Sequence, residues 1–136
     1  LEAYDVSLSL RPDDADTYTN RGAALGNLGR HEEALEAYDI LLSLRPNGAD
    51  THMGRGAALS NLGRYEDALE AYDISLSLRP NHADTHYSKS LCLGYMGWLK
   101  DALASAEQAV KIKPNFQEAV EQVEDLKQQL KKKGRK

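Results

Sequence analysis

The sequence predicts an all-α fold built from stacked helical hairpins, and three regularities lead to this class. Prolines recur every 34 residues, at Pro12, Pro46, Pro80 and Pro114. Glycines keep the same interval, at Gly29, Gly63 and Gly97. Between them, apolar residues follow the three- and four-residue spacing of amphipathic helices. A hairpin of this size cannot bury its apolar face alone, so neighbouring hairpins must stack and share one core.

The chain opens on part of a repeat. Residues 1–10, LEAYDVSLSL, nearly copy residues 69–78, LEAYDISLSL. Residues 1–14 are therefore predicted to be the second helix of a partial repeat, with the turn that follows it. Since residue 1 is Leu and falls inside the repeated pattern, we expect the chain to be a piece of a longer array.

Three full repeats follow, at residues 15–48, 49–82 and 83–116, and the first two differ at only eight of 34 positions. The first repeat predicts helices over 15–28 and 31–44. Its second helix carries an apolar stripe of Ala34, Leu35, Tyr38, Leu41 and Leu42. Gly29 is predicted to end the first helix in the left-handed conformation that glycine tolerates.

Residues 117–136 predict a last helix and a basic tail. Ala119, Val120, Val123, Leu126 and Leu130 form a narrow apolar stripe, and the remaining residues of the helix are mainly Glu, Gln and Lys. A repeat array needs a terminal helix with a polar outer face. We therefore expect this segment to cap the array.

Small residues, aromatics and prolines recur at fixed positions of the 34-residue unit. The eighth position holds Gly22, Gly56 and Ser90, and the twentieth holds Ala34, Ala68 and Ala102. The twenty-fourth holds Tyr4, Tyr38 and Tyr72, with Ala106 as the departure. Over residues 1–116 this pattern resembles the tetratricopeptide repeat family. The resemblance implies a right-handed α-solenoid, the superhelix of that family, with the first helices of the repeats lining its concave side.

In that family the concave groove is the usual docking place for peptides or partner helices. Carried over position by position, the groove residues from the first two repeats are Asp16, Thr19, Asn20, Ala23, Gly26, Asn27, Asp50, Met53, Ala57, Ser60 and Asn61. Those from the third repeat are Asp84, Tyr87, Leu91, Gly94 and Tyr95. Some family members grip acidic C-terminal tails with basic residues in this groove. The set contains no Lys or Arg, so we predict that this chain lacks such a clamp.

The sequence thus predicts a protein–protein interaction module, a scaffold or adaptor. Met53, Tyr87, Leu91 and Tyr95 are apolar and aromatic side chains of the kind that anchor interfaces. The alternative is a self-associating building block, forming a homodimer through an open N-terminal edge of Leu1, Tyr4 and Leu8. The near-identical repeats also leave a designed or consensus origin open.

Other functional classes find little support in the composition. Residues 1–116 carry 11 basic and 17 acidic groups, whereas nucleic-acid binding relies on clustered Lys and Arg. No apolar run approaches the ~20 residues of a membrane-spanning helix. The sequence shows no catalytic signature, so we predict no enzyme activity and no cofactor. We also predict no metal site: His82 and His86 flank Asp84, but routine packing is the favoured interpretation.

Three further features have a structural and a functional interpretation. Arg21, Arg55 and Lys89 recur at one position, either as a basic ladder or, as we favour, as side chains that lie on the core and pair with neighbouring acids. Cys92 is expected to be buried as a small apolar residue. Trp98 is expected to pack against the terminal helix rather than to serve as an exposed anchor.

Overall fold

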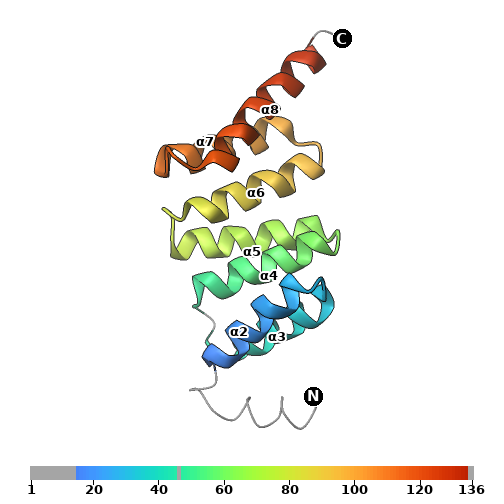
Figure 1. The fold of residues 1–136 in the computed structure, drawn as a ribbon, viewed down its shortest axis with the longest axis vertical. Helices are drawn as coiled ribbons and strands as arrows, with labels where there is room; N and C mark the ends of the chain where they lie inside the picture. The colour runs from blue at the N-terminus through green and yellow to red at the C-terminus, as the bar shows by residue number, and fades with distance from the viewer. Residues whose placement is uncertain (1–14, 46, 135–136) are drawn as a thin grey trace. The chain divides into compact units, whose positions relative to one another are not determined.

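The computed structural model describes residues 15–45 and 47–134 of the chain, and all the regular structure in these ranges is α-helical (Figure 1). The helices are α2 (Ala15–Asn27), α3 (His31–Leu44), α4 (Ala49–Asn61), α5 (Tyr65–Leu78), α6 (Ala83–Tyr95), α7 (Leu99–Ile112) and α8 (Gln117–Gly134). The predicted all-α class is confirmed. The predicted self-association residues Leu1, Tyr4 and Leu8 lie outside the described residues.

The chain divides into two compact units, and each is described by itself. The N-terminal unit ends at Leu78; in it α2 packs on α3, α3 on α4 and α4 on α5, with α2 also beside α4. The C-terminal unit begins at Arg79; in it α6 packs on α7 and α7 on α8. Each unit therefore stacks helical hairpins in chain order.

Glycine makes the tight turn inside each hairpin. Gly29, Gly63 and Gly97 have φ angles of 79°, 79° and 83°, which confirms the left-handed conformation predicted for Gly29. At the first turn, the Arg30 N–H donates to the carbonyl of Leu25 at 2.9 Å. The same six-residue bond recurs at the other two turns, so orphan carbonyls at each helix end are satisfied in the same way.

A tyrosine fills the space between neighbouring helices in the N-terminal unit. Tyr38 on α3 is buried against two glycines, Gly22 on α2 and Gly54 on α4. A Cβ atom at Gly22 would stand 2.8 Å from the Tyr38 ring, and one at Gly54 would stand 2.5 Å from it. Tyr72 on α5 lies equally close to Gly56 on α4. The small residues at these positions are therefore required by the adjacent rings.

The C-terminal unit fills the corresponding space differently. Ala106 on α7 stands where α3 and α5 carry tyrosine, and it is fully buried. The Ser90 hydroxyl on α6 donates to the carbonyl of Ala102 at 2.7 Å. The Gln122 side chain on α8 donates to the Ser90 hydroxyl at 3.3 Å. Polar contacts among three helices thus replace one aromatic ring.

The inner face of α8 joins the core of its unit. Ala119 and Leu126 are buried, and Ala119 packs in one cluster with Phe116 and Ala109. Val120, Val123 and Leu130 are half-buried. The apolar stripe predicted for this helix is therefore the side that faces the protein.

Candidate functional site

The groove residues predicted in the N-terminal unit belong to α2 and α4, which lie side by side. Thr19, Gly26, Met53, Ala57 and Ser60 are half-buried. Asn20, Ala23, Asn27, Asp50 and Asn61 are exposed. The side chain of Asp16 lies outside the described residues. The remaining residues all reach the surface, and most of them are small, so this part of the surface offers little contact area.

The residues predicted in the C-terminal unit are larger and lie along α6. Asp84 is exposed, Tyr87, Leu91 and Gly94 are half-buried, and Tyr95 is 69% exposed. An aromatic side chain this exposed keeps most of its apolar surface in contact with water. Among the predicted residues of this helix, Tyr95 is the large apolar side chain that is most exposed.

A hollow separates α6 from α8, and we call it the α6–α8 cleft. Its volume is about 220 Å³, and its lining consists of Leu91, Gly94, Tyr95, Gln122, Asp125, Leu126 and Gln129. Three of these residues come from the predicted groove set and four from α8. The cleft is therefore formed by predicted residues of α6 and by residues of α8 that were not predicted to line a groove.

The α8 wall was missed because that helix was interpreted only as a cap. A signal was present in the sequence: Gln117 follows Ala83 by 34 residues, so α8 keeps the register of a first helix. In that register Glu121, Asp125 and Gln129 occupy positions equivalent to Tyr87, Leu91 and Tyr95. The same rule that selected groove residues on α6 selects these residues on α8.

Tyr87 lies one helical turn before Leu91 on α6, and its ring packs against Phe116. Its ring centroid lies 5.1 Å from that of Phe116, with the two rings inclined at 56°. Burial raises the pKa of the Tyr87 phenol, and Glu118, Tyr95 and Glu121 raise it further. The surroundings of α6 and α8 are therefore aromatic and acidic at once.

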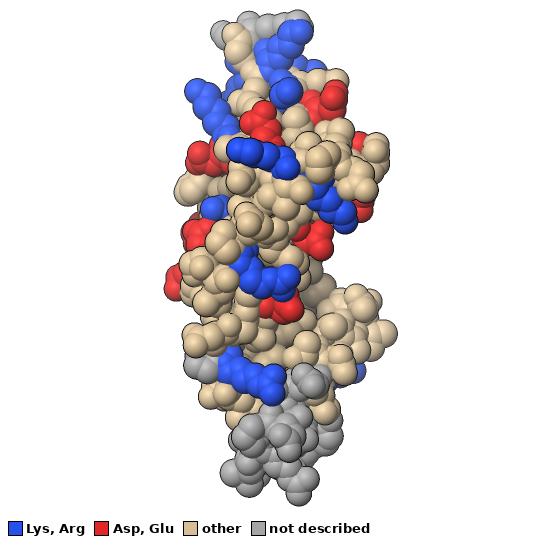
Figure 2. Space-filling model, turned by 90° about the vertical axis from the view of Figure 1, so that its left-hand side faces the viewer, with Lys and Arg blue, Asp and Glu red and all other residues tan. Residues whose placement is uncertain are grey.

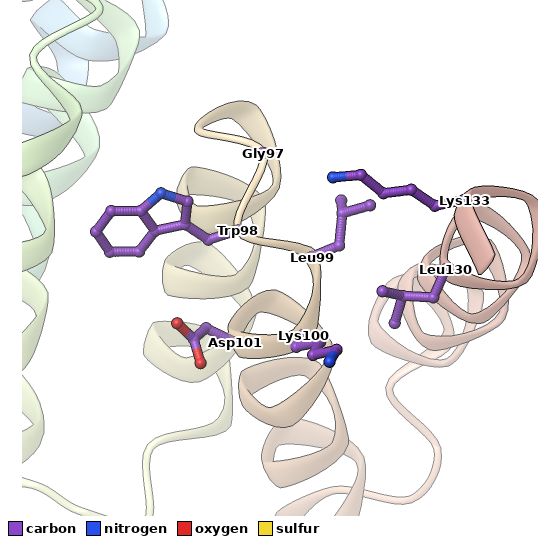
Figure 3. A pocket seen from close by; sticks show the side chains of 7 residues that line it. All are labelled: Gly97, Trp98, Leu99, Lys100, Asp101, Leu130 and Lys133. Atoms are coloured by element: carbon purple, nitrogen blue, oxygen red, sulfur yellow. The ribbon is translucent and has the colours of Figure 1, made fainter. Parts of the chain in front are cut away.

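A second hollow, of about 430 Å³, lies at the turn between α6 and α7. Figure 3 shows Leu99 and Leu130 directed toward one another, with Lys133 beside them on α8. The indole of Trp98 points away from α8 and is 52% exposed. The expectation that Trp98 packs against the terminal helix is wrong, because Leu99 takes that contact instead.

Arg55 shows how one of the recurrent basic residues is used. Its Nε donates to the Asp39 carboxylate on the neighbouring helix α3 at 2.7 Å. The interpretation of Arg55 as an ion-pair partner within the scaffold is confirmed. On the described surface that Figure 2 presents, Lys and Arg side chains lie among Asp and Glu side chains.

The two histidines of the loop and first turn of α6 are held by hydrogen bonds. Nδ1 of His82 lies 2.7 Å from the Thr85 hydroxyl, and Nε2 of His86 lies 2.8 Å from the carbonyl of Pro80. Within residues 15–45 and 47–134, no three His, Cys, Asp or Glu side chains gather as metal ligands would. Cys92 is fully buried, as predicted.

In the described part of the chain, every helix is too short or too polar to cross a lipid bilayer.

Comparison with known proteins identifies the repeat. Curated protein sequences give no significant match. Many solved structures resemble the fold. Three of them are the first tetratricopeptide domain of Spaghetti (RPAP3) bound to the HSP90 peptide SRMEEVD, the Sgt2 tetratricopeptide domain of Aspergillus fumigatus, and the second such domain of human RPAP3 with the HSP70 peptide SGPTIEEVD. Their TM-scores are 0.83, 0.86 and 0.79, and their sequence identities are 18%, 21% and 20%.

These alignments cover 88%, 90% and 86% of this chain and 95%, 83% and 98% of the three structures. A family profile described as tetratricopeptide repeat matches residues 1–50, 19–83 and 53–115. Together the matched ranges extend over most of the sequence. The chain belongs to the tetratricopeptide repeat family.

Proposed function

We propose that the chain is a peptide-binding interaction module that acts through the first helices of its repeats. The α6–α8 cleft carries this proposal, because Tyr95 is 69% exposed beside a hollow floored by the buried Leu126. An exposed aromatic at a concave, partly apolar site is the arrangement that interface anchors share. Two structural neighbours hold peptides, which supports the same function for this fold.

We further propose repeat boundaries at 15–48, 49–82 and 83–116, with α8 as a capping helix. A comparison of α4 with α8 supports the cap. On α4, Gly56 faces Tyr72 of the next helix and Leu59 is buried. At the same register α8 carries Glu124 and Lys127, both exposed. Charged residues there would be costly to bury under another helix, so this side of α8 suits solvent.

The test is a selection of binding peptides from a random displayed library, using the full 136-residue chain. Affinities of the selected peptides are then measured for Tyr95→Ala and Leu91→Ala. We expect each substitution to weaken binding about tenfold, as interface anchors commonly do. Tyr87→Ala is a poorer choice, since Tyr87 also packs on Phe116 and its loss would loosen the unit.

Trp98→Ala is the matched control, because it removes another exposed aromatic outside the α6–α8 cleft. Selected peptides should bind this variant as they bind the parent chain. Peptides that ignore Tyr95→Ala but are lost with Trp98→Ala would refute the proposed site. A selection that enriches no peptide would refute the function.

A further inference from the structure

The α6–α8 cleft has room for one long side chain rather than for a helix. Its volume is about 220 Å³, and Leu91 and Leu126 give it an apolar lining. A Cβ placed at Gly94 would meet the Gln122 amide at 3.8 Å, an ordinary van der Waals contact, so the glycine itself fills little of the cleft. A ligand side chain can therefore lie along the wall of α6.

Acidic side chains follow one face of α8 beside this cleft. Glu118, Glu121 and Asp125 are spaced three and four residues apart, and all are exposed. The Asp125 carboxylate accepts a hydrogen bond from the Gln129 amide at 2.7 Å. Among the described residues, no Lys or Arg lies within ion-pair distance of these three carboxylates. Their charge is left for solvent or for a ligand.

An aromatic ring and a carboxylate face the same hollow, because Tyr95 and Asp125 both line the cleft. One turn before Leu91 on α6, the pKa of Tyr87 is raised by burial and by Glu118, Tyr95 and Glu121. A contact of this kind is present outside the cleft lining: Lys113 Nζ lies 5.2 Å from the centroid of the Phe116 ring, which itself packs on Tyr87. A cation beside these aromatic faces is favourable.

Lys and Arg have the chemistry that matches this surface. Their methylene stems cover apolar surface while the charged end reaches outward. In the cleft the stem would contact Leu91 and Tyr95, and the charge would meet the carboxylates of Glu121 and Asp125. An acidic tail, such as that of the HSP90 peptide SRMEEVD or the HSP70 peptide SGPTIEEVD, would be repelled by the same carboxylates.

We propose that the α6–α8 cleft binds a positively charged peptide segment, with one Lys or Arg side chain lying between Tyr95 and the acidic face of α8. This inference rests on the proposed function and adds the chemical class of the partner. A basic clamp recognises acidic tails, whereas the α6–α8 cleft recognises a basic segment.

The test uses three fluorescent peptides with one common framework that carry Lys, Gln or Glu at the same three positions. Their affinities for the full chain are measured by anisotropy at low and at physiological salt. We expect the Lys peptide to bind about tenfold more tightly than the Gln peptide, and the Glu peptide to bind least. The preference should shrink as salt rises, because the carboxylates are exposed.

Two double variants locate the effect. Glu121→Gln with Asp125→Asn removes two charges at the cleft, and should lower the affinity of the Lys peptide about tenfold. Glu66→Gln with Glu70→Gln removes two exposed charges from α5 and gives the same net charge. This second variant should bind the Lys peptide as the parent chain does.

Equal loss in both double variants, or no loss in either, would overturn the inference. So would equal binding of the Lys and Gln peptides that still depends on Tyr95, but the proposed function would then stand. If none of the three peptides binds, the inference fails, whereas the library selection decides the function separately.

Discussion

The N-terminal and C-terminal units solve the same packing problem with different residues. Where Tyr38 lies between Gly22 and Gly54, the equivalent positions of the C-terminal unit hold Ala106, Ser90 and Gln122. In the first set one large ring meets two residues without side chains. In the C-terminal unit the central residue, Ala106, is small, and the side chains of Ser90 and Gln122 supply the volume instead. Volume is exchanged among three helices, so a change at one position is tolerated only with changes at the other two.

The largest expected effect on stability comes from introducing a tyrosine at position 106 of the C-terminal unit. Ala106→Tyr adds a ring at a fully buried position, while Ser90 and Gln122 hold the positions that glycines hold around Tyr38. We expect a loss of about 3 kcal/mol in the free energy of unfolding, at the upper end of what overpacking costs. Urea denaturation followed by circular dichroism measures it.

Two compensating substitutions test whether positions 90, 106 and 122 are coupled. Adding Ser90→Gly and Gln122→Gly recreates the arrangement around Tyr38, and should recover at least half of the loss despite the lower helix propensity of glycine. If the triple variant is no more stable than Ala106→Tyr alone, the three positions do not act as one set.

An intermediate effect is expected from filling the space beside Tyr38. Gly54→Ala places a Cβ atom 2.5 Å from the ring, so the ring must move. We expect a net loss of about 1–2 kcal/mol, since overpacking outweighs the gain in helix propensity.

Gly26→Ala is its matched control, because a Cβ there meets no atom within 4 Å. This variant should gain up to about 1 kcal/mol from propensity alone. The two substitutions are chemically identical and should shift the urea midpoint in opposite directions. A gain in stability for both variants would mean that the Tyr38 ring can shift without losing its packing contacts.

The smallest effect is expected at the surface of the N-terminal unit. Arg55→Ala removes a partly exposed ion pair with Asp39, and should cost about 0.5 kcal/mol in low salt and less in high salt. Arg64→Ala removes a longer contact of 3.6 Å to Glu32 and should change stability very little. If high salt leaves the cost of Arg55→Ala unchanged, packing of its stem rather than charge is responsible.

The repetitive features of the fold could be predicted from the sequence, while the local substitutions could not. Helix starts 34 residues apart and the turn at Gly29 follow from periodicity and from backbone conformations that few residues adopt. The departure at Ala106 was visible as a missing aromatic. Nothing in a single repeat indicates that Ser90 and Gln122 compensate for it, because Gln122 lies on another helix and the contact depends on how α6, α7 and α8 pack.

The candidate site was predicted on one wall only. Tyr95 and Leu91 were selected by their positions in the repeat, and the structure places both beside the cleft. The opposite wall was missed because Glu121, Asp125 and Gln129 were taken as the solvated face of a cap. Trp98 was wrongly placed because both it and Leu99 follow the turn glycine, and the backbone direction that chooses between them is set by tertiary packing.

Since α8 forms one wall of the α6–α8 cleft, partner binding and the docking of this helix are thermodynamically linked. Local opening of a single helix costs less free energy than unfolding of the whole domain. Each opening of α8 removes half the binding surface, so the apparent affinity scales with the fraction of molecules in which α8 is docked. In return, a ligand at a hundred times its dissociation constant stabilises the docked state by about 2.7 kcal/mol. Slower hydrogen exchange along α8 would therefore report occupancy of the cleft.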